Sequence, residues 1–265
     1  MKVAAVQCNA TDDKGYNLAK AVFFIQQAIR QKAKLIALPE VFIFRGKIRD
    51  KKILNNVAEN IPGPTIGLLS TIAGKHKVFI LAGSIYEKSP VGNRVYNASA
   101  LINPQGKVAA KYRKMNLFDA VLGKRRLKES DTFLAGKKPV MTTIEKFKAG
   151  LSICYDARFP ALYQFYSRHG ADILFVPSAF TQKTGQAHWE VLLRARAIEN
   201  LCYVIAPNQT GTDQRGVACF GHSMIINPWG EILAKASADK EEIIYADVEM
   251  RAIRANRKIL PSLKK

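Results

Sequence analysis

Hydrophobic and polar positions follow two different periods in the first thirty residues of the chain. Residues 2–7, KVAAVQ, form a short apolar run of the kind that makes a buried strand. Apolar residues then recur at the i, i+3, i+4, i+7 spacing of an amphipathic helix, at Leu18, Ala21, Val22, Ile25, Ala28 and Ile29. The chain therefore begins with a predicted strand followed by a predicted helix.

The same alternation continues through the first half. We predict strands at residues 34–40, 77–87, 95–102 and 107–112, and helices that begin near residues 50 and 65. The segment NPQG at 103–106 has a proline at its second position and a glycine at its end, which suits a type I turn. Because this turn joins two predicted strands, we expect a β-hairpin there.

The second half repeats the pattern. Strands are predicted at residues 146–153, 173–177, 202–206, 223–226, 232–235 and 242–247, and helices at 159–168 and 188–200. This pattern favours an α/β fold of layered sheets covered by helices over a helical bundle or an all-β sandwich. No linker or internal repeat divides the sequence, so we expect a single domain over residues 1–250 and a basic tail over 251–265.

The composition adds a strong positive charge. The chain has 265 residues, is 48% hydrophobic and carries a formal net charge of +20. Its basic residues cluster at 45–52, 123–128 and 251–265, which we interpret mainly as solvated faces. The clusters lack the repeated aromatic residues of a single-strand binder, and charge alone gives only nonspecific attraction to nucleic acid. A nucleic-acid-binding or partner-binding module is therefore kept only as the non-enzyme alternative.

Cysteine and histidine usage points away from disulfides and metals. Four cysteines are scattered without a CxxC pair, at Cys8, Cys154, Cys202 and Cys219. The histidines, at 76, 169, 188 and 222, are scattered too and show no metal-ligand spacing. We expect free thiols in a reducing compartment, with no metal and no cofactor.

Apolar runs are short throughout. Segments such as VAAV and ILFV fall well below the about 20 residues that a membrane helix requires. The first residues lack the apolar segment of roughly 7–15 residues found in a signal peptide. We therefore expect a cytoplasmic protein that does not bind membranes.

Three polar residues follow predicted strands, and their side chains suit acyl transfer. Glu40 ends LIALPE, Lys114 ends KVAAKYRK and Cys154 ends KFKAGLSIC. Ligand sites in open α/β sheets lie outside the carboxyl ends of the strands. A carboxylate can take the thiol proton while a lysine stabilises charge on a carbonyl oxygen. The alternatives are a buried structural thiol with solvated charges, or a pair of Cys154 with His188 or His222.

Several blocks of sequence resemble a known family. LIALPEVF, KYRKMNLFDA, KESDTFLAG and GLSICYDARFP resemble the successive motifs of the nitrilase superfamily, the carbon–nitrogen hydrolases. The later blocks PSAFTQKTGQAHWEVLLRARAIENLCYVIAPNQ and GHSMIINPWGEIL are similar to its amidase branch, which contains omega-amidase and deaminated-glutathione amidase. The resemblance runs from residue 1 to about residue 250. It implies a four-layer αββα sandwich that pairs with a second subunit, so we expect a homodimer.

The resemblance also implies roles for individual residues. It makes Glu40 the general base, Lys114 the catalytic lysine and Cys154 the nucleophile of a thioester mechanism. Glu129, in KESD, matches the additional carboxylate that holds the lysine and helps to position the substrate. The backbone N–H of Tyr155 is expected to share the oxyanion with Lys114.

Further residues are candidates for substrate binding. Arg158 has the fork geometry that pairs with a carboxylate, although an internal ion pair with Asp156 or another acid is the alternative. The other candidates around the mouth of the site are Tyr155, Ser178, Ala179, Phe180 and Phe42, of which Phe180 and Phe42 also suit the core. His188 is expected to cap or pack rather than to act as a base.

The sequence departs from the family pattern in three places, which affect the expectations for substrate choice and for the dimer contacts of the tail. Asn116 stands where relatives carry histidine, residues 119–130 are unusually basic, and the C-terminal segment is short. The resulting hypothesis is an amidase that acts on small carboxylate-bearing amides, of the deaminated glutathione or 2-oxoglutaramate type. N-carbamoyl hydrolysis and nitrile hydrolysis with the same three residues are the enzymatic alternatives.

Overall fold

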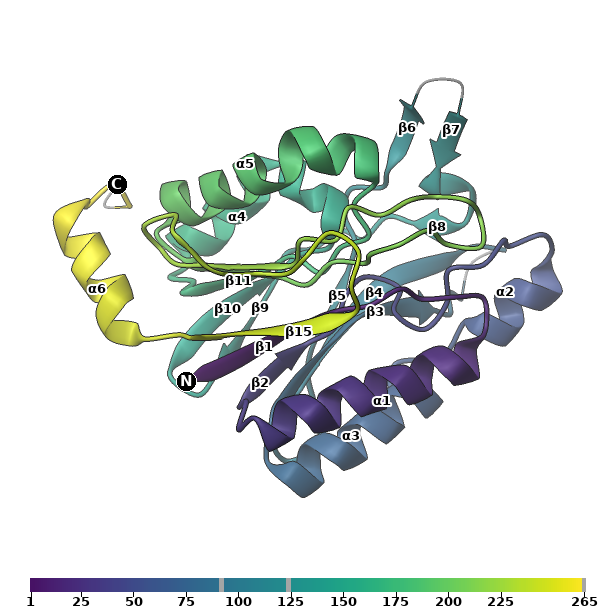
Figure 1. The fold of residues 1–265 in the computed structure, drawn as a ribbon, viewed down its shortest axis with the longest axis horizontal. Helices are drawn as coiled ribbons and strands as arrows, with labels where there is room; N and C mark the ends of the chain where they lie inside the picture. Colours follow the sequence, from purple (N-terminus) through teal and green to yellow (C-terminus); the bar gives the residue numbers. More distant parts are fainter. Residues whose placement is uncertain (91–92, 123–124, 264–265) are drawn as a thin grey trace.

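Two β-sheets lie face to face in the middle of the molecule, and helices cover the outer face of each (Figure 1). The structure is a computed structural model that describes residues 1–90, 93–122 and 125–263. The first sheet contains β1 (Lys2–Gln7), β2 (Leu35–Ala37), β3 (Phe79–Glu87), β4 (Val95–Ile102), β5 (Val108–Arg113), β8 (Phe133–Leu134) and β15 (Glu242–Asp247). The second contains β9 (Val140–Ile144), β10 (Phe147–Leu151), β11 (Ile173–Phe175), β12 (Tyr203–Ala206), β13 (Met224–Ile226) and β14 (Ile232–Lys235).

The helices complete a four-layer arrangement. Helices α1 (Lys14–Arg30) and α3 (Pro64–His76) lie along the first sheet, and α4 (Pro160–Arg168) and α5 (Gln182–Asn200) lie along the second (Figure 1). The remaining elements are α2 (Lys51–Val57), α6 (Met250–Ile259), the hairpin of β6 (Asp119–Leu122) and β7 (Arg125–Lys128), and the short turns of helix η1 (Glu129–Asp131) and η2 (Cys154–Arg158). The predicted αββα class is confirmed.

The two sheets have parallel centres and antiparallel flanks. The order of the first sheet is β15-β1-β2-β3-β4-β5, with β8 beside β4, and the order of the second is β14-β13-β12-β11-β10-β9. Strands β1, β2 and β3 are parallel to one another, as are β10, β11 and β12. The carboxyl ends of β2 and β5 point the same way, because β4 runs antiparallel to both of its neighbours β3 and β5.

The alternation of side chains along β1 explains the layers. Val3 and Ala5 belong to the core between the two sheets, whereas Ala4 and Val6 pack with residues of the outer helices such as Ile25. Successive side chains of a strand point to opposite faces, so a strand that is buried on both faces is apolar throughout. The unbroken run at residues 2–7 therefore reflects one core between the sheets and a second under α1 and α3.

Most predicted elements are confirmed, several of them residue for residue. Strands β1, β4, β14 and β15 have the predicted bounds, and α2 begins one residue after Asp50, whose side chain accepts the N–H of Ile53 at 2.9 Å. The NPQG hairpin is present, since β4 and β5 pair antiparallel. Helix α5, however, begins at Gln182 and not at residue 188. The predicted start is too late because the first turns are polar and show no apolar spacing.

Residues 251–259 of the expected basic tail belong to α6. This helix lies at the edge of the molecule, beyond the end of β15 (Figure 1). Ile253 is buried, and Arg257 forms an ion pair with Asp172 at 3.0 Å. No helix within the described ranges is both long and apolar enough to cross a membrane.

Candidate active site

Glu40, Lys114, Glu129 and Cys154 line one cavity of about 220 Å³. Glu40 lies three residues after β2, Lys114 directly follows β5, and Cys154 begins η2 three residues after β10. Glu129 begins η1 directly after β7. The cavity therefore lies between the two sheets, at the edge where the carboxyl ends of these strands meet.

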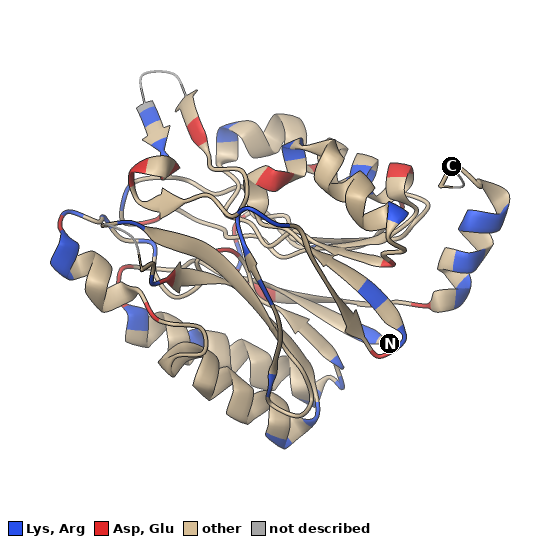
Figure 2. Ribbon diagram, turned by 180° about the vertical axis from the view of Figure 1, so that it is seen from behind, with Lys and Arg blue, Asp and Glu red and all other residues tan. Residues whose placement is uncertain are grey.

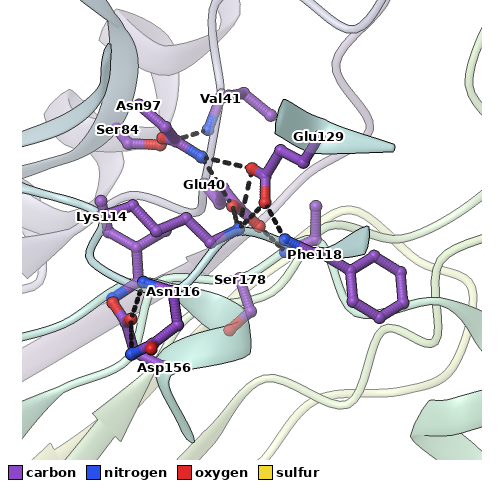
Figure 3. A network of polar contacts seen from close by, with 12 residues as sticks. Glu40, Val41, Ser84, Asn97, Lys114, Asn116, Phe118, Glu129, Asp156 and Ser178 are labelled. Atoms are coloured by element: carbon purple, nitrogen blue, oxygen red, sulfur yellow. Dashed lines mark hydrogen bonds and ion pairs between the residues drawn. The ribbon is translucent and has the colours of Figure 1, made fainter. Parts of the chain in front are cut away.

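Lys114 stands between two carboxylates (Figure 3). Its Nζ donates to Glu40 Oε1 at 2.8 Å and to both oxygens of Glu129, at 2.9 and 2.8 Å. Burial opposes the charge on Lys114, but Glu129 and Glu40 raise its pKa well above the ordinary value. The ammonium group is therefore charged and held in a fixed position.

Glu40 is a buried carboxylate whose oxygens all have donors. Besides Lys114, Oε1 accepts from Asn97 Nδ2 at 2.8 Å, and Oε2 accepts from the backbone N–H of Ala179 at 2.8 Å. Burial raises the pKa of Glu40, but Lys114 and these hydrogen bonds lower it by a larger amount. The pKa of Glu40 therefore lies below its ordinary value. Glu40 is ionised at neutral pH.

Glu129 is also fixed by several hydrogen bonds. Its carboxylate accepts from the backbone N–H of Phe118 at 2.6 Å and from Asn97 Nδ2 at 3.2 Å, in addition to Lys114 (Figure 3). Asn97, which lies on β4, thus donates to both carboxylates. The side chain of Glu129 remains 14% exposed, because it faces the cavity rather than the core.

Cys154 occupies a tight turn at the start of η2. Its φ of +49° lies in the left-handed region, which a side chain other than glycine adopts only under constraint from its surroundings. Burial and the negative charge of Glu40 raise the pKa of the thiol well above its ordinary value, although Lys114 and the N–H of Ala179 lower it. The thiol is therefore protonated next to an ionised carboxylate.

The turn also presents a backbone donor. The N–H of Cys154 donates to Pro177 O, and that of Asp156 donates to Ile153 O. By contrast, the N–H of Tyr155 has no acceptor in the described part of the chain, as expected for the first turn of a helix.

Asp156 connects this turn to the strand that carries Lys114. Its carboxylate is buried and accepts from Tyr112 Oη at 2.7 Å, from Ile153 N at 2.9 Å and from Asn116 Nδ2 at 2.8 Å. Tyr112 belongs to β5, so Asp156 links the two sheets beneath the cavity. Asn116 acts in this link and does not line the cavity.

The other predicted binding residues fall into two groups. Ala179 lines the main cavity, and Tyr155, Arg158 and Phe180 line a small adjoining pocket that also includes Cys154. Phe42 and Ser178 line neither pocket. Phe42 packs in the core beneath α1 and α3, and Ser178 Oγ donates to the backbone oxygen of Val176.

Arg158 makes no internal ion pair with Asp156. Its guanidinium lies over the rings of Tyr155 and Phe180, and Nη2 lies 3.2 Å from His188 Nδ1. His188 lies within α5 rather than at its start and lines neither pocket. His222 contacts Ala236 O and the ring of Phe220, so neither histidine adjoins Cys154 in the two pockets.

Sequence reasoning missed polar residues that surround the cavity. Asn97 was detectable as a lone amide within the apolar strand 95–102. The interpretation of residues 45–52 as a solvated face is wrong for Arg45. Its side chain is only 1% exposed and pairs with Asp213 Oδ2 at 2.8 Å. The remaining charge is spread over the outer helices, loops and α6 (Figure 2).

The described residues contain no cluster of three or more His, Cys, Asp or Glu side chains that could hold a metal ion. The carboxylate oxygens of Glu40 and Glu129 around Lys114 accept from ammonium, amide and backbone donors.

Comparison with known proteins identifies the family. The carbon–nitrogen hydrolase family model matches residues 2–258. The chain is 44% identical to deaminated glutathione amidase of Synechocystis over 264 residues, which cover 98% of this chain and 96% of that protein. It is 37% identical to omega-amidase NIT2 of Homo sapiens over 261 residues, with 98% and 92% covered.

A solved structure shares the fold. Nit3 of Saccharomyces cerevisiae, described as a member of branch 10 of the nitrilase superfamily, superposes with a TM-score of 0.88 at 34% identity. The superposition covers 100% of this chain and 95% of that one. The chain therefore belongs to the carbon–nitrogen hydrolase family and has the αββα fold of the nitrilase superfamily.

Proposed function

We propose that this carbon–nitrogen hydrolase is an amidase that cleaves small carboxylate-bearing amides to a carboxylic acid and ammonia through a thioester on Cys154. One observation supports this most directly. A protonated thiol, an ionised Glu40 and a charged Lys114 line the same cavity. These are the protonation states that a base-assisted thiol attack requires at neutral pH.

In the first step, Glu40 accepts the thiol proton as the sulfur of Cys154 attacks the amide carbon. The carbonyl π electrons move to oxygen, and the resulting oxyanion is stabilised by Lys114 and by the N–H of Tyr155. Glu40 then gives the proton to the amide nitrogen, the C–N bond breaks, and ammonia leaves. The acyl group remains on sulfur as a thioester.

In the second step, water attacks the thioester and Glu40 takes one of its protons. Collapse of this second tetrahedral intermediate breaks the C–S bond. The proton returns to sulfur, and the free acid leaves. The overall reaction consumes one amide and one water, and Glu40 ends the cycle ionised as it began.

Glu129 holds Lys114 in this scheme and helps to position the substrate. Its contacts with Lys114, Phe118 and Asn97 support that role. Tyr155, Arg158, Ala179 and Phe180 remain the candidates for contacts with the substrate, since they line the two pockets that contain Cys154.

The substrate class follows from the relatives and from charge. The relatives are a deaminated glutathione amidase and omega-amidases, whose names support a small amide with a free carboxylate. Lys128, on the basic hairpin, lines the cavity and would attract such an anion. We propose deaminated glutathione or 2-oxoglutaramate as the substrate. Carbamoyl amino acids or nitriles would use the same three residues.

An ammonia-release screen over amides, carbamoyl amino acids and nitriles tests the proposal. Carbamoyl substrates would release carbon dioxide with the ammonia, and nitriles would consume two waters. Cys154→Ala should abolish release, whereas Cys8→Ala, which removes another buried thiol outside the pockets, should retain it. Ammonia release at the wild-type rate by Cys154→Ala would contradict the thioester mechanism.

The non-enzyme alternative is tested with the same thiol. Iodoacetamide labelling of Cys154 should abolish ammonia release and leave any binding of nucleic acid unchanged. If the protein bound a nucleic acid tightly and hydrolysed nothing, the binding-module alternative would replace the amidase.

We also propose a cytoplasmic homodimer. Apolar side chains are exposed along α5 and at the turn between β13 and β14, at Val191, Ile198 and Trp229. Apolar side chains gathered on one surface are typical of a subunit interface. Light scattering at micromolar concentration should give twice the mass of the chain.

A further inference from the structure

A second cavity lies outside the candidate active site. Its volume is about 490 Å³, within the range of roughly 300–1,000 Å³ that small-molecule sites occupy. Its walls come from β4, β5 and residues 135–140. Among the described parts of the chain, the two cavities share no lining residue. A ligand in the second cavity would therefore leave the site around Cys154 open.

The walls of this cavity are strongly positive. Four cations line it, at Lys111, Arg113, Lys137 and Lys138, and no acidic residue of the described ranges does so. The buried Glu87, which does not line the cavity, pairs with Lys111 and Arg113 and balances one of the four charges. Charges of one sign around a concave site focus their field into it. The cavity should therefore attract an anion.

Arg113 is fixed in the wall before a ligand arrives. Its Nε and Nη2 donate to Glu87 at 2.6 and 2.9 Å, and its guanidinium lies 3.8 Å from the centre of the Tyr96 ring. Within the described ranges, no residue accepts from its Nη1. The guanidinium therefore keeps a donor for a ligand, and little side-chain freedom remains to be lost on binding.

Lys137 and Lys138 are the unpaired cations of the cavity. Both are exposed, and neither forms an ion pair with any residue that the structure describes. Gly136 brings them against β5, because its N–H donates to Lys114 O at 2.7 Å. A Cβ at this position would lie 2.1 Å from Arg113 O, so only glycine allows the close approach. The fold thus places both lysines in the same cavity as Arg113.

We propose that this cavity binds the oligophosphate group of a small molecule, through Arg113 Nη1 and the ammonium groups of Lys137 and Lys138. Hydrogen bonds from arginine and lysine to phosphate oxygens are charge-assisted and about twice as strong as neutral ones. A di- or triphosphate carries several negative charges close together and can contact all three cations at once. A monocarboxylate would leave most of the excess positive charge unbalanced. The site is separate from the proposed amidase activity and does not depend on it.

The experiment is a calorimetric titration of the intact protein with tripolyphosphate at low salt. We expect one bound ligand per chain, weaker binding of pyrophosphate and the weakest binding of inorganic phosphate. Because partly exposed ion pairs are individually weak, the double variant Lys137→Gln/Lys138→Gln should lower the affinity for tripolyphosphate about tenfold. Arg113→Lys should lower it too, because the charge remains but Nη1 is lost.

A matched double variant separates the cavity from the net charge of the chain. Lys51→Gln/Lys52→Gln removes two adjacent exposed lysines of α2 that do not line the cavity, and it should bind tripolyphosphate as the wild type does. An equal loss in both double variants would mean that the overall charge attracts the anion. That result, or an unchanged affinity in Lys137→Gln/Lys138→Gln, would overturn the proposal.

Two further measurements separate this cavity from the candidate active site. Alkylation of Cys154 by iodoacetamide should leave the affinity for tripolyphosphate unchanged, and so should Lys128→Gln, since both residues line the other cavity. If either change abolishes binding while Lys137→Gln/Lys138→Gln does not, the anion binds beside Cys154 and the proposal is wrong. Because these titrations need no turnover, their result is independent of whether any amide is hydrolysed.

Titration with ATP identifies the source of the phosphate chain. The ring of Tyr96 already carries the guanidinium of Arg113, so we expect a base to add little and ATP to bind as tightly as tripolyphosphate. Much tighter binding of ATP would assign the site to nucleotides. If a single-stranded oligonucleotide binds through Lys137 and Lys138 and tripolyphosphate does not bind, the ligand is a nucleic-acid backbone and the proposal is overturned.

Discussion

Both carboxylate oxygens of Glu129 accept hydrogen bonds from Nζ of Lys114, at 2.9 and 2.8 Å. Glu40 Oε1 accepts a third, so each of the three N–H bonds of the ammonium is directed at a carboxylate. An oxyanion that forms next to Lys114 must therefore share one of these donors. The two glutamates hold the charge of Lys114 in place before the reaction begins, which is the condition for electrostatic preorganisation.

The Glu129–Lys114 contact predicts a large loss of activity in Glu129→Gln. The amide would keep one acceptor for Lys114 but lose its charge and its second acceptor. We expect kcat to fall about 10- to 100-fold, as for the loss of a hydrogen bond between charged groups. Ammonia release measures this, and an unchanged circular dichroism spectrum verifies the fold. A kcat within twofold of wild type would show that Glu129 is dispensable.

Lys114→Ala should have a stronger effect. Removing an oxyanion donor lowers turnover by about 10²–10³-fold, and here the same change leaves Glu40 and Glu129 facing each other without a cation. Lys111→Ala is the matched control, since Lys111 pairs with Glu87 outside the cavity. Single-turnover kinetics with butanamide should show slow formation of the acyl-enzyme only in Lys114→Ala. Full activity in that variant would remove Lys114 from the mechanism.

The pH profile of the wild type should reflect Glu40. Its pKa is lowered from the ordinary value of 4.5, so the active ionised form persists until the pH falls below that value. The thiol pKa is raised well above 9.0, so Cys154 stays protonated through neutral pH. For the uncharged substrate butanamide we expect a constant kcat/KM at neutral pH and a decline below pH 4.5. A half-maximal rate near pH 7 would assign the base to a histidine instead.

Salt should weaken binding of an anionic substrate. Lys128 and Arg215 line the cavity and are 42% and 39% exposed, so mobile ions can screen them. The screening length falls from about 10 Å at 0.1 M to about 3 Å at 1 M. The KM for succinamate should rise over this range, while the KM for butanamide should change little. Equal changes for the two amides would contradict electrostatic attraction at the mouth.

Acid stability should depend on Glu87. Its buried carboxylate pairs with Lys111 and Arg113, each at 2.6 Å, and its pKa is lowered from 4.5 because these cations outweigh burial. A lowered pKa means that the pair stabilises the fold above pH 4.5 and that this contribution is lost as the pH falls through the folded-state value.

Glu87→Gln should therefore unfold more easily at neutral pH and converge with the wild type in acid. Because both cations are about one-third exposed, solvent screening limits the difference to about 1 kcal/mol. Urea titrations at pH 7 and pH 3 measure it. A difference that stays constant with pH would mean that the pair does not titrate in this range.

The local elements were predictable because their signals are local. Strand β1 is a run of consecutive apolar residues, and Asp50 caps α2 with its own side chain. The first turns of α5 escaped prediction because Gln182 and its neighbours are polar. Gly185 is also buried so close to Phe220, a residue of a distant loop, that a larger side chain would not fit there. The helix at residues 250–259 was not predicted because its arginines gave the segment the composition of a basic tail.

The site was predictable only in part. Glu40, Lys114 and Cys154 each follow a predicted strand, and the resemblance to the family added Glu129. The partnership of Arg45 with Asp213 joins residues 168 positions apart, and only the folded chain shows it. The same holds for Asn97, whose amide donates to two carboxylates that lie far apart in the sequence, Glu40 and Glu129.

The cavity lies across the junction of two sheets, and this has a consequence for assembly of the enzyme. Glu40, Lys114 and Glu129 precede residue 135, and Cys154 follows it. A cut in the loop between β8 and β9 would divide the proposed base, Glu40, and the proposed nucleophile, Cys154, between two polypeptides. Each fragment alone would be inert, and complementation of the two would restore turnover only when the sheets dock in register.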